Sequence, residues 1–249
     1  ELQFSLLPRQ FPNVPPGTQS HEGALQFLSL FFPTGNVSGD FFTVIQVCED
    51  SVGVFICDVM GHGVRSALLT TMIRALVEEH APHIKEADKL LARVNQGLTG
   101  ILQHSGTMMF ATGFYLILDI GSSQINYASA GHPAPFLITH DGGAIELLNG
   151  EGSSGPAMGL FAGASYRATQ RAVHQGDFII LFTDGLFEVE GASGELFSKE
   201  ALLDCVKRRI SLPPQEILNR MVKEVREFSH EKRFDDDVCV VGVQLRHRG

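Results

Sequence analysis

Short apolar runs rich in Val, Ile and Phe recur along this 249-residue chain, and they constrain its fold more than any other feature. Runs of this kind, bounded by turn-forming residues, are typical of buried strands. Two of them, 41–48 and 52–57, are joined by the short turn Glu49-Asp50-Ser51, which predicts an antiparallel hairpin. Further strands are expected at 24–32, 109–119, 124–130, 134–139, 144–148, 166–173, 178–183 and 238–245.

Two pairs of helices are expected between the strands. The first pair spans 64–79 and 86–103, and the second spans 198–209 and 214–228. Each pair contains a stripe at helical spacing. The stripes are Val64, Ala67, Leu68, Thr71, Met72 and Ala75 in the first pair, and Ile217, Met221, Val225 and Phe228 in the second. Strands joined mainly by hairpins, with helix pairs inserted, predict an α+β protein whose antiparallel sheets are covered by helices.

No composition shift divides the chain, so residues 21–249 are interpreted as one domain. The proline-rich residues 1–20 show no clear period and are expected to be an irregular lead-in. Because the chain begins at Glu1 and not at methionine, we expect an upstream region in the full-length protein.

The net charge of −9 argues against a nucleic-acid-binding surface, which needs a basic stripe. No apolar run approaches the roughly 20 residues of a membrane span, and no signal peptide is visible. The four cysteines form no C-x-x-C pair, which predicts reduced thiols in a cytoplasmic protein. A disulfide between Cys48 and Cys57 is the alternative.

Aspartates stand at the ends of four apolar runs, and this pattern is the main functional signal. The four stretches are Ser38-Gly39-Asp40, Asp58 to Gly63, Thr183-Asp184-Gly185 and Asp235-Asp236-Asp237. An antiparallel hairpin over 41–57 would make Asp40 and Asp58 neighbours. Carboxylate oxygens suit Mg²⁺ or Mn²⁺, and such a cluster can hold two cations about 3.5–4 Å apart. Singly, each aspartate beside a glycine is common turn chemistry, but together they favour a metal centre that hydrolyses phosphate esters.

The turn after Asp58 carries two glycines, Gly61 and Gly63, which allow backbone to approach a ligand closely. The Val59 carbonyl could therefore bind a cation. His62, between the glycines, is open to three interpretations: a general acid, a metal ligand or a turn residue that supports the site. His132, in Ala130-Gly131-His132-Pro133, could likewise be only a turn residue.

In order along the chain, the segments SGDFF, ICDVMGHGV, YASAGHPAPFL, LFTDGLFE and DDDVCVV closely resemble one family. The chain resembles the bacterial metal-dependent serine/threonine protein phosphatases of the PPM superfamily, of the sporulation-stage-II-E type found in sigma-factor regulators. The resemblance covers nearly the whole chain. It implies an α-β-β-α sandwich, with two antiparallel sheets packed face to face, flanking helix pairs, and two Mn²⁺ or Mg²⁺ ions at one end.

The resemblance also implies a role for each aspartate. Asp58 would bridge both metals, Asp184 and Asp236 would complete one site, and Asp40 with the Val59 carbonyl would help form the other. Asp236 is preferred over Asp237 because the family's ligand lies three positions before a usual threonine.

Other positions depart from the family's pattern or are expected to act around the ligands. His62 and Asp237 would support the ligands without binding the metals. The departures leave every implied ligand in place, and they are Ser38, Thr43, Met60 and Cys239.

The activity implied is hydrolysis of phosphoserine or phosphothreonine in a protein by a hydroxide that two metals activate. The implied substrate is a phosphorylated anti-sigma-factor antagonist, and the implied partners are an upstream sensor domain and a second copy in a homodimer. No nucleic acid or membrane contact is expected. The alternative is a catalytically weak module that uses the same fold to dock a regulatory partner.

Overall fold

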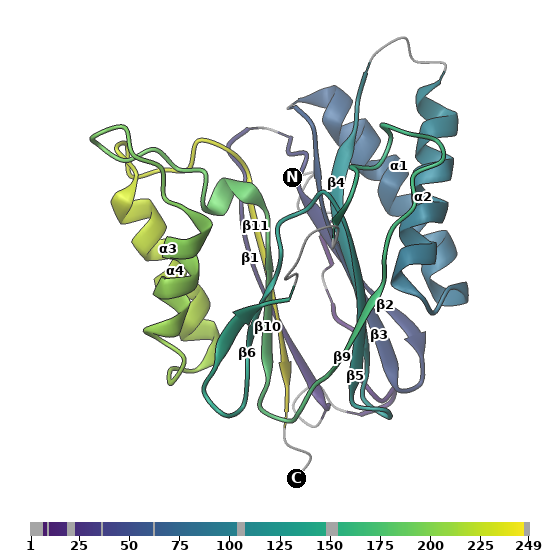
Figure 1. Cartoon of the computed structure of the whole chain (residues 1–249), viewed down its shortest axis with the longest axis horizontal. Helices are drawn as coiled ribbons and strands as arrows, with labels where there is room; N and C mark the ends of the chain where they lie inside the picture. The colour runs from purple at the N-terminus through teal and green to yellow at the C-terminus, as the bar shows by residue number, and fades with distance from the viewer. Residues whose placement is uncertain are drawn as a thin grey trace.

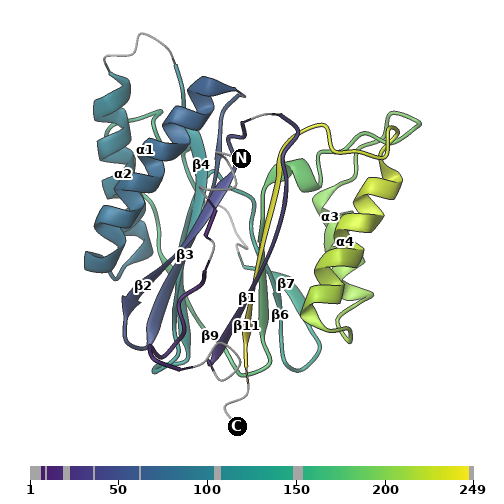
Figure 2. The ribbon, with the colours of Figure 1, turned by 180° about the vertical axis from the view of Figure 1, so that it is seen from behind.

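Two sheets lie face to face, and a pair of helices covers the outer side of each (Figures 1 and 2). The first sheet has the strand order β1-β11-β10-β6-β7, and the second has the order β2-β3-β4-β5-β8, with β9 also paired to β5. All pairs are antiparallel except the two-residue pair of β5 and β8. The computed structural model describes residues 7–8, 10–18, 23–35, 37–61, 63–103, 108–147 and 154–246. This architecture confirms the predicted α-β-β-α sandwich.

The elements lie close to the ranges expected from the sequence. The first sheet consists of β1 (Leu25–Phe32), β6 (Phe136–Ile138), β7 (Ala144–Glu146), β10 (Phe178–Phe182) and β11 (Val238–Leu245). The second consists of β2 (Phe41–Cys48), β3 (Ser51–Val59), β4 (Ala111–Asp119), β5 (Gln124–Ala130), β8 (Ser154–Gly155) and β9 (Thr169–Ala172). The helices are α1 (Val64–His80), α2 (Ala87–Leu102), α3 (Lys199–Lys207) and α4 (Pro214–Phe228). Short 3-10 turns lie at Ala81–His83 and Asp184–Leu186.

The central strands are buried on both faces, which explains their nearly continuous apolar sequences. In β3, Val52, Val54 and Ile56 face the core between the sheets. The alternate residues Phe55 and Cys57 face α1 and α2. The period of two in a strand thus divides one apolar run between two cores. A third core lies between the other sheet and α3 and α4.

The stripe predicted on α4 packs against its sheet, with Ile217, Met221 and Val225 buried. The stripe predicted on α1 does not. Val64, Leu68 and Met72 are exposed, and the buried residues of this helix are Ser66, Leu69, Thr70, Ile73 and Val77. The helix is where the periodicity places it, but that stripe does not face the core. The reason is that α1 carries apolar residues on two faces.

Smaller differences concern the loops. The Gly- and Ser-rich stretch expected as a loop from 149 to 165 contains the short strand β8 in its described part. The irregular segment before β1 packs on the sandwich, since Val14 is fully buried and Phe11 stacks on Phe27 and Phe42. All four cysteines are free thiols, so the predicted reduced state is confirmed and the Cys48–Cys57 disulfide is not formed. Among the described helices, none has the length and apolar character that a membrane crossing requires.

Candidate metal centre

The hairpin of β2 and β3 brings the first two aspartates together. Phe41 pairs with Cys57 in the antiparallel register, so Asp40 and Asp58, one residue further along each strand, meet at the same end of the sheet. The two carboxyl groups affect each other, since the charge of Asp58 raises the pKa of Asp40. The neighbourhood predicted from the sequence is therefore confirmed. Asp58 is the next-to-last residue of β3 and does not follow the strand.

The other aspartates arrive from the opposite sheet. Strands β10 and β11 are antiparallel neighbours, with Phe182 opposite Val240, so the end of β10 lies beside the start of β11. Asp184 begins the 3-10 turn that follows β10. A Cβ atom at Gly185 would lie only 2.1 Å from the Asp237 carbonyl oxygen, so glycine is required where the two segments touch.

Electrostatics show that the aspartates of the two sheets form one cluster. Burial, followed by the charges of Asp184 and Asp236, raises the pKa of Asp58 to about 7. Burial and the charge of Asp58 raise the pKa of Asp40 well above its usual value. Burial, Glu188 and Asp236 raise the pKa of Asp184. Carboxylates that repel one another in this way bind a cation readily, because the cation offsets the repulsion.

The backbone around Val59 also reaches this cluster. A Cβ atom at Gly39 would lie 2.5 Å from the Val59 carbonyl oxygen, so this oxygen is directed at the loop that carries Asp40. The Val59 side chain is fully buried, which holds its peptide in place. The carbonyl therefore lies against the loop that carries Asp40.

Thr183 is a residue of the site that the sequence did not single out. Its hydroxyl donates a hydrogen bond to Asp40 Oδ2 at 2.6 Å and accepts one from the Cys239 amide at 3.0 Å. It thereby joins one aspartate of the first hairpin to the opposite sheet. The tripeptide Thr183-Asp184-Gly185 was noticed for its aspartate, but the partners of the hydroxyl come from segments far away in the sequence.

Asp237 differs from Asp236 in what it touches. Asp237 Oδ1 accepts hydrogen bonds from the Thr34 amide at 2.7 Å and hydroxyl at 3.0 Å, and Oδ2 accepts one from the Gly39 amide at 3.3 Å. Its carboxylate is thus used to tie together the segments around β1 and β2. Asp236 is exposed, and its Oδ1 accepts the amide of Asp237 at 2.7 Å.

Three further positions named from the sequence are His62, Thr43 and His132. His62 lies outside the described residues. Thr43 is buried in β2. His132 is buried, its Nδ1 lies 2.9 Å from Thr112 Oγ1, and burial lowers the pKa of the imidazole to about 3. His132 is therefore neutral and helps to fix the turn after β5.

A tighter grouping of metal-ligating atoms lies elsewhere in the described part of the chain. His140, His174 and Asp177 bring ligand atoms within 4.8 Å of one another. Asp177 precedes β10, whereas Asp184 follows it, so this group lies at the opposite end of that strand. The buried Asp177 carboxylate accepts the amides of His140 at 2.7 Å and His174 at 2.9 Å, which accounts for it as a link between two turns.

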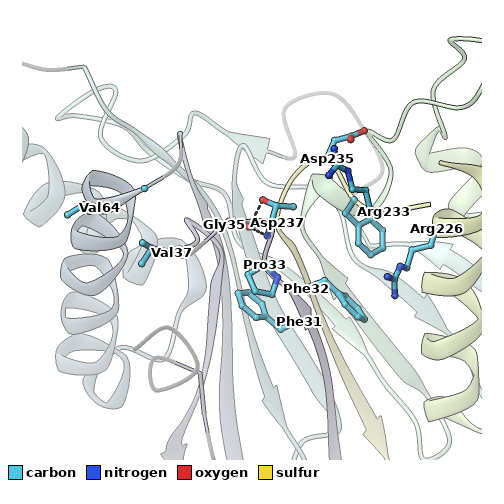
Figure 3. Close-up of a pocket in the computed structure, with 13 residues that line it drawn as sticks. Phe31, Phe32, Pro33, Gly35, Val37, Val64, Arg226, Arg233, Asp235 and Asp237 are labelled. Carbon is cyan, nitrogen blue, oxygen red and sulfur yellow. Dashed lines mark hydrogen bonds between the residues drawn. The ribbon is translucent and has the colours of Figure 1, made fainter. Parts of the chain in front are cut away.

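A hollow of about 960 Å³ adjoins the aspartate cluster (Figure 3). It is lined by the segment after β1, the start of α1, the last turn of α4 and the segment before β11. Asp235 and Asp237 both line it, so the hollow reaches the residues on either side of Asp236.

Comparison with known proteins agrees with this fold. Two relatives from Bacillus subtilis (strain 168) are each 26% identical over 223 residues: phosphoserine phosphatase RsbP (89% of this chain, 53% of that protein) and phosphoserine phosphatase RsbU (88% and 63%). This chain thus spans less than two thirds of either relative. The SiaA-PP2C domain of Pseudomonas aeruginosa has the same fold, with a TM-score of 0.75 and 22% identity over 88% of this chain and 85% of that one.

The family model described as Stage II sporulation protein E (SpoIIE) matches residues 49–246. That range is most of the chain and includes every aspartate of the cluster except Asp40. The chain therefore belongs to the family described as Stage II sporulation protein E (SpoIIE).

Proposed function

We propose that this chain is a protein serine/threonine phosphatase that removes phosphate from phosphoserine or phosphothreonine with the help of two Mn²⁺ or Mg²⁺ ions. The observation that carries the proposal is the cluster of aspartates that both sheets deliver to one end of the sandwich. Their pKa values are raised by burial and by one another. The phosphatase relatives support the reaction class.

The donor set fits these metals. Every candidate ligand is an oxygen, and hard oxygen ligands are what Mg²⁺ and Mn²⁺ prefer. Asp58 lies centrally and would contact both ions, while Asp184 and Asp236 would complete one site. Asp40 and the Val59 carbonyl would belong to the other. When bound, the two ions make water a nucleophile at neutral pH and neutralise charge on the phosphoryl oxygens.

The remaining residues hold this arrangement. The Thr183 hydroxyl fixes one oxygen of Asp40, which leaves its other oxygen available to a ligand. Asp237 holds the Thr34 and Gly39 amides and so fixes the loop that precedes Asp40. Asp237 is in this proposal an anchor and not a ligand.

We further propose a phosphorylated anti-sigma-factor antagonist as substrate and an upstream sensor domain as regulator, in a cytoplasmic, dimeric protein. The contact of α1 with the site supports regulation through this helix. Thr70 of α1 is buried and donates a hydrogen bond to the Gly39 carbonyl at 3.0 Å. A shift of α1 would therefore move the loop that carries Asp40.

The test of the main proposal is metal-dependent turnover. Purified protein should hydrolyse an aryl phosphate and a phosphoserine peptide only with added Mn²⁺ or Mg²⁺, and a chelator should abolish the activity. Zn²⁺ should substitute poorly. Full activity in a chelated, metal-free sample would refute the two-metal assignment. Partner binding without turnover at any Mn²⁺ concentration would favour the docking module instead.

A further inference from the structure

The hollow beside the aspartates has two sides of different chemistry (Figure 3). Val37 and Val64 lie on the side of α1, and Val64 is 69% exposed. Arg226 and Arg233 lie on the side of α4. We call this hollow the arginine pocket. It also contains Phe31, Phe32, Pro33, Thr34, Gly35 and Phe234.

Arg226 is held in place by two aromatic rings, and no carboxylate of the described residues pairs with it. Its guanidinium carbon lies 5.6 Å from the centre of the Phe32 ring and 5.7 Å from that of Phe234. The two rings are themselves 5.6 Å apart. A cation over an aromatic face is attracted by the negative charge of the ring's π-electrons. The contact orients the guanidinium group, and within the part of the chain that the structure describes no side-chain acceptor occupies its N–H donors.

Cationic side chains gather at this place in a chain that is acidic as a whole, and they lie beside Asp235 and Asp237 of the same lining. The chain carries a net charge of −9. A second hollow on the other side of Phe32 and Arg226 is lined by Lys223 and Lys232. Arg233 is paired with Glu231 at the rim, and Lys223 with Glu227 at 3.6 Å. These exposed pairs exchange readily for a better anionic partner, because surface ion pairs contribute little.

We propose that the arginine pocket binds the part of the phosphoprotein substrate that flanks its phosphorylated residue, with an acidic side chain against Arg226 and Arg233. The inference rests on the proposed phosphatase function. A phosphoryl group at the aspartate cluster leaves the neighbouring substrate residues beside Asp235 and Asp237, where the pocket begins. An apolar substrate residue fits against Val37 and Val64.

The guanidinium groups make the acidic side chain the favoured occupant. Arginine presents a planar fork of donors that matches a carboxylate with two parallel hydrogen bonds. The two arginines also offset the repulsion that an acidic peptide meets near the aspartates. Substrate selection then depends on the residues beside the phosphoserine. A small aryl phosphate has no such residues, so its hydrolysis is independent of the arginine pocket.

The test uses two phosphoserine peptides that differ only in flanking residues, one with Asp and Glu and one with Asn and Gln. Wild-type protein should have a kcat/KM about tenfold higher for the acidic peptide, as expected for a charged hydrogen bond of about 1.5 kcal/mol. Arg226→Gln and Arg233→Gln should each bring this ratio toward one. Arg226→Lys should lie between, because lysine keeps the charge but loses the fork.

Arg220→Gln is the matched control. Arg220 lies on the same helix, is paired with Glu216, and lies outside the arginine pocket. It should leave the ratio unchanged. Thermal denaturation of each variant separates misfolding from altered recognition.

A binding measurement keeps this proposal separate from the phosphatase proposal. Fluorescence anisotropy of the two labelled peptides should show the same preference without turnover, and Arg226→Gln should remove it. If wild-type protein hydrolyses neither peptide nor the aryl phosphate, the phosphatase proposal fails while anisotropy still judges the pocket. Equal binding of both peptides to wild type, or an unchanged preference in both arginine variants, would overturn the pocket assignment.

Discussion

The two halves of the sandwich both contribute aspartates to the candidate metal centre, but these aspartates differ in the contacts that they make. The sheet with β2 and β3 contributes Asp40 and Asp58, which lie next to each other and share their repulsion. The sheet with β10 and β11 contributes Asp184, Asp236 and Asp237. Of these, Asp237 is fully engaged by backbone and hydroxyl donors. The β2–β3 half therefore places two carboxylates side by side. The β10–β11 half also supplies, through Asp237, hydrogen bonds that connect the two halves.

The two helices that border the site, α1 and α4, also differ in how completely they bury their apolar residues. Helix α4 buries its apolar stripe and turns polar residues outward. Helix α1 buries one apolar face and exposes another, with Leu68 57% and Met72 40% exposed. Helix α4 thus has its predicted apolar stripe covered by the sheet, whereas α1 leaves an apolar face exposed.

The largest effect should come from Asp58→Asn, which tests whether the α1 half carries the chemistry. Turnover of an aryl phosphate with Mn²⁺ should fall at least about 1,000-fold, since several kcal/mol of charge stabilisation depend on this ligand. The metal-free protein should be at least as stable as wild type, because a repelling charge is removed. Unchanged specific activity with a lower melting temperature would show that Asp58 is structural.

Truncation of the buried stripes should affect both halves alike. Leu69→Ala in α1 and Met221→Ala in α4 should each lower the free energy of unfolding by about 2–5 kcal/mol, because both side chains are buried in a packed core. Urea denaturation with a common slope measures this. A much smaller loss for Leu69→Ala would mean that α1 is only loosely packed on its sheet.

Asp237→Asn tests the linking role of the other half. The free energy of unfolding should fall by about 1.5–3 kcal/mol, because a charged acceptor of three hydrogen bonds is weakened. Asp235→Asn is the control, since Asp235 is an exposed neighbour on the same segment. It should change stability by less than about 0.5 kcal/mol. Equal effects of the two substitutions would count against the anchor.

The charged half should also make stability depend on pH. The pKa of Asp58 is raised to about 7 in the folded state, so between pH 4 and 7 the folded protein binds more protons than the unfolded chain. Stability of metal-free protein should therefore fall as pH rises from 5 to 8, by about 1–2 kcal/mol. Thermal denaturation across this range measures it, and Asp58→Asn should flatten the curve. Stability that rises with pH would contradict the cluster.

The smallest effect is expected for Leu68→Ala, one position before the buried Leu69. Leu68 is exposed, so the free energy of unfolding should change by less than about 0.5 kcal/mol. Denaturation of the Leu68→Ala and Leu69→Ala pair compares the two faces of α1 directly. A large loss for Leu68→Ala would show that the exposed face is covered in solution.

The sequence was enough to predict the helices, the strands other than β8, and the pairing of Asp40 with Asp58. These depend on local patterns: apolar runs, helical spacing, and a hairpin whose ends must meet. It also gave the order of motifs that leads to the family. It did not decide which stripe of α1 is buried, because two apolar faces satisfy the same periodicity.

The contacts between residues far apart in the sequence could be found only from the tertiary structure. Thr183 reaches Asp40 across 143 positions of sequence, and Asp237 reaches Thr34 across 203. Arg226 finds Phe32 and Phe234 only once α4 packs against β1 and the segment before β11. Such contacts leave no periodic signal, because a hydroxyl, a carboxylate or a guanidinium group can be satisfied by many partners. The packing of two sheets selects one of them.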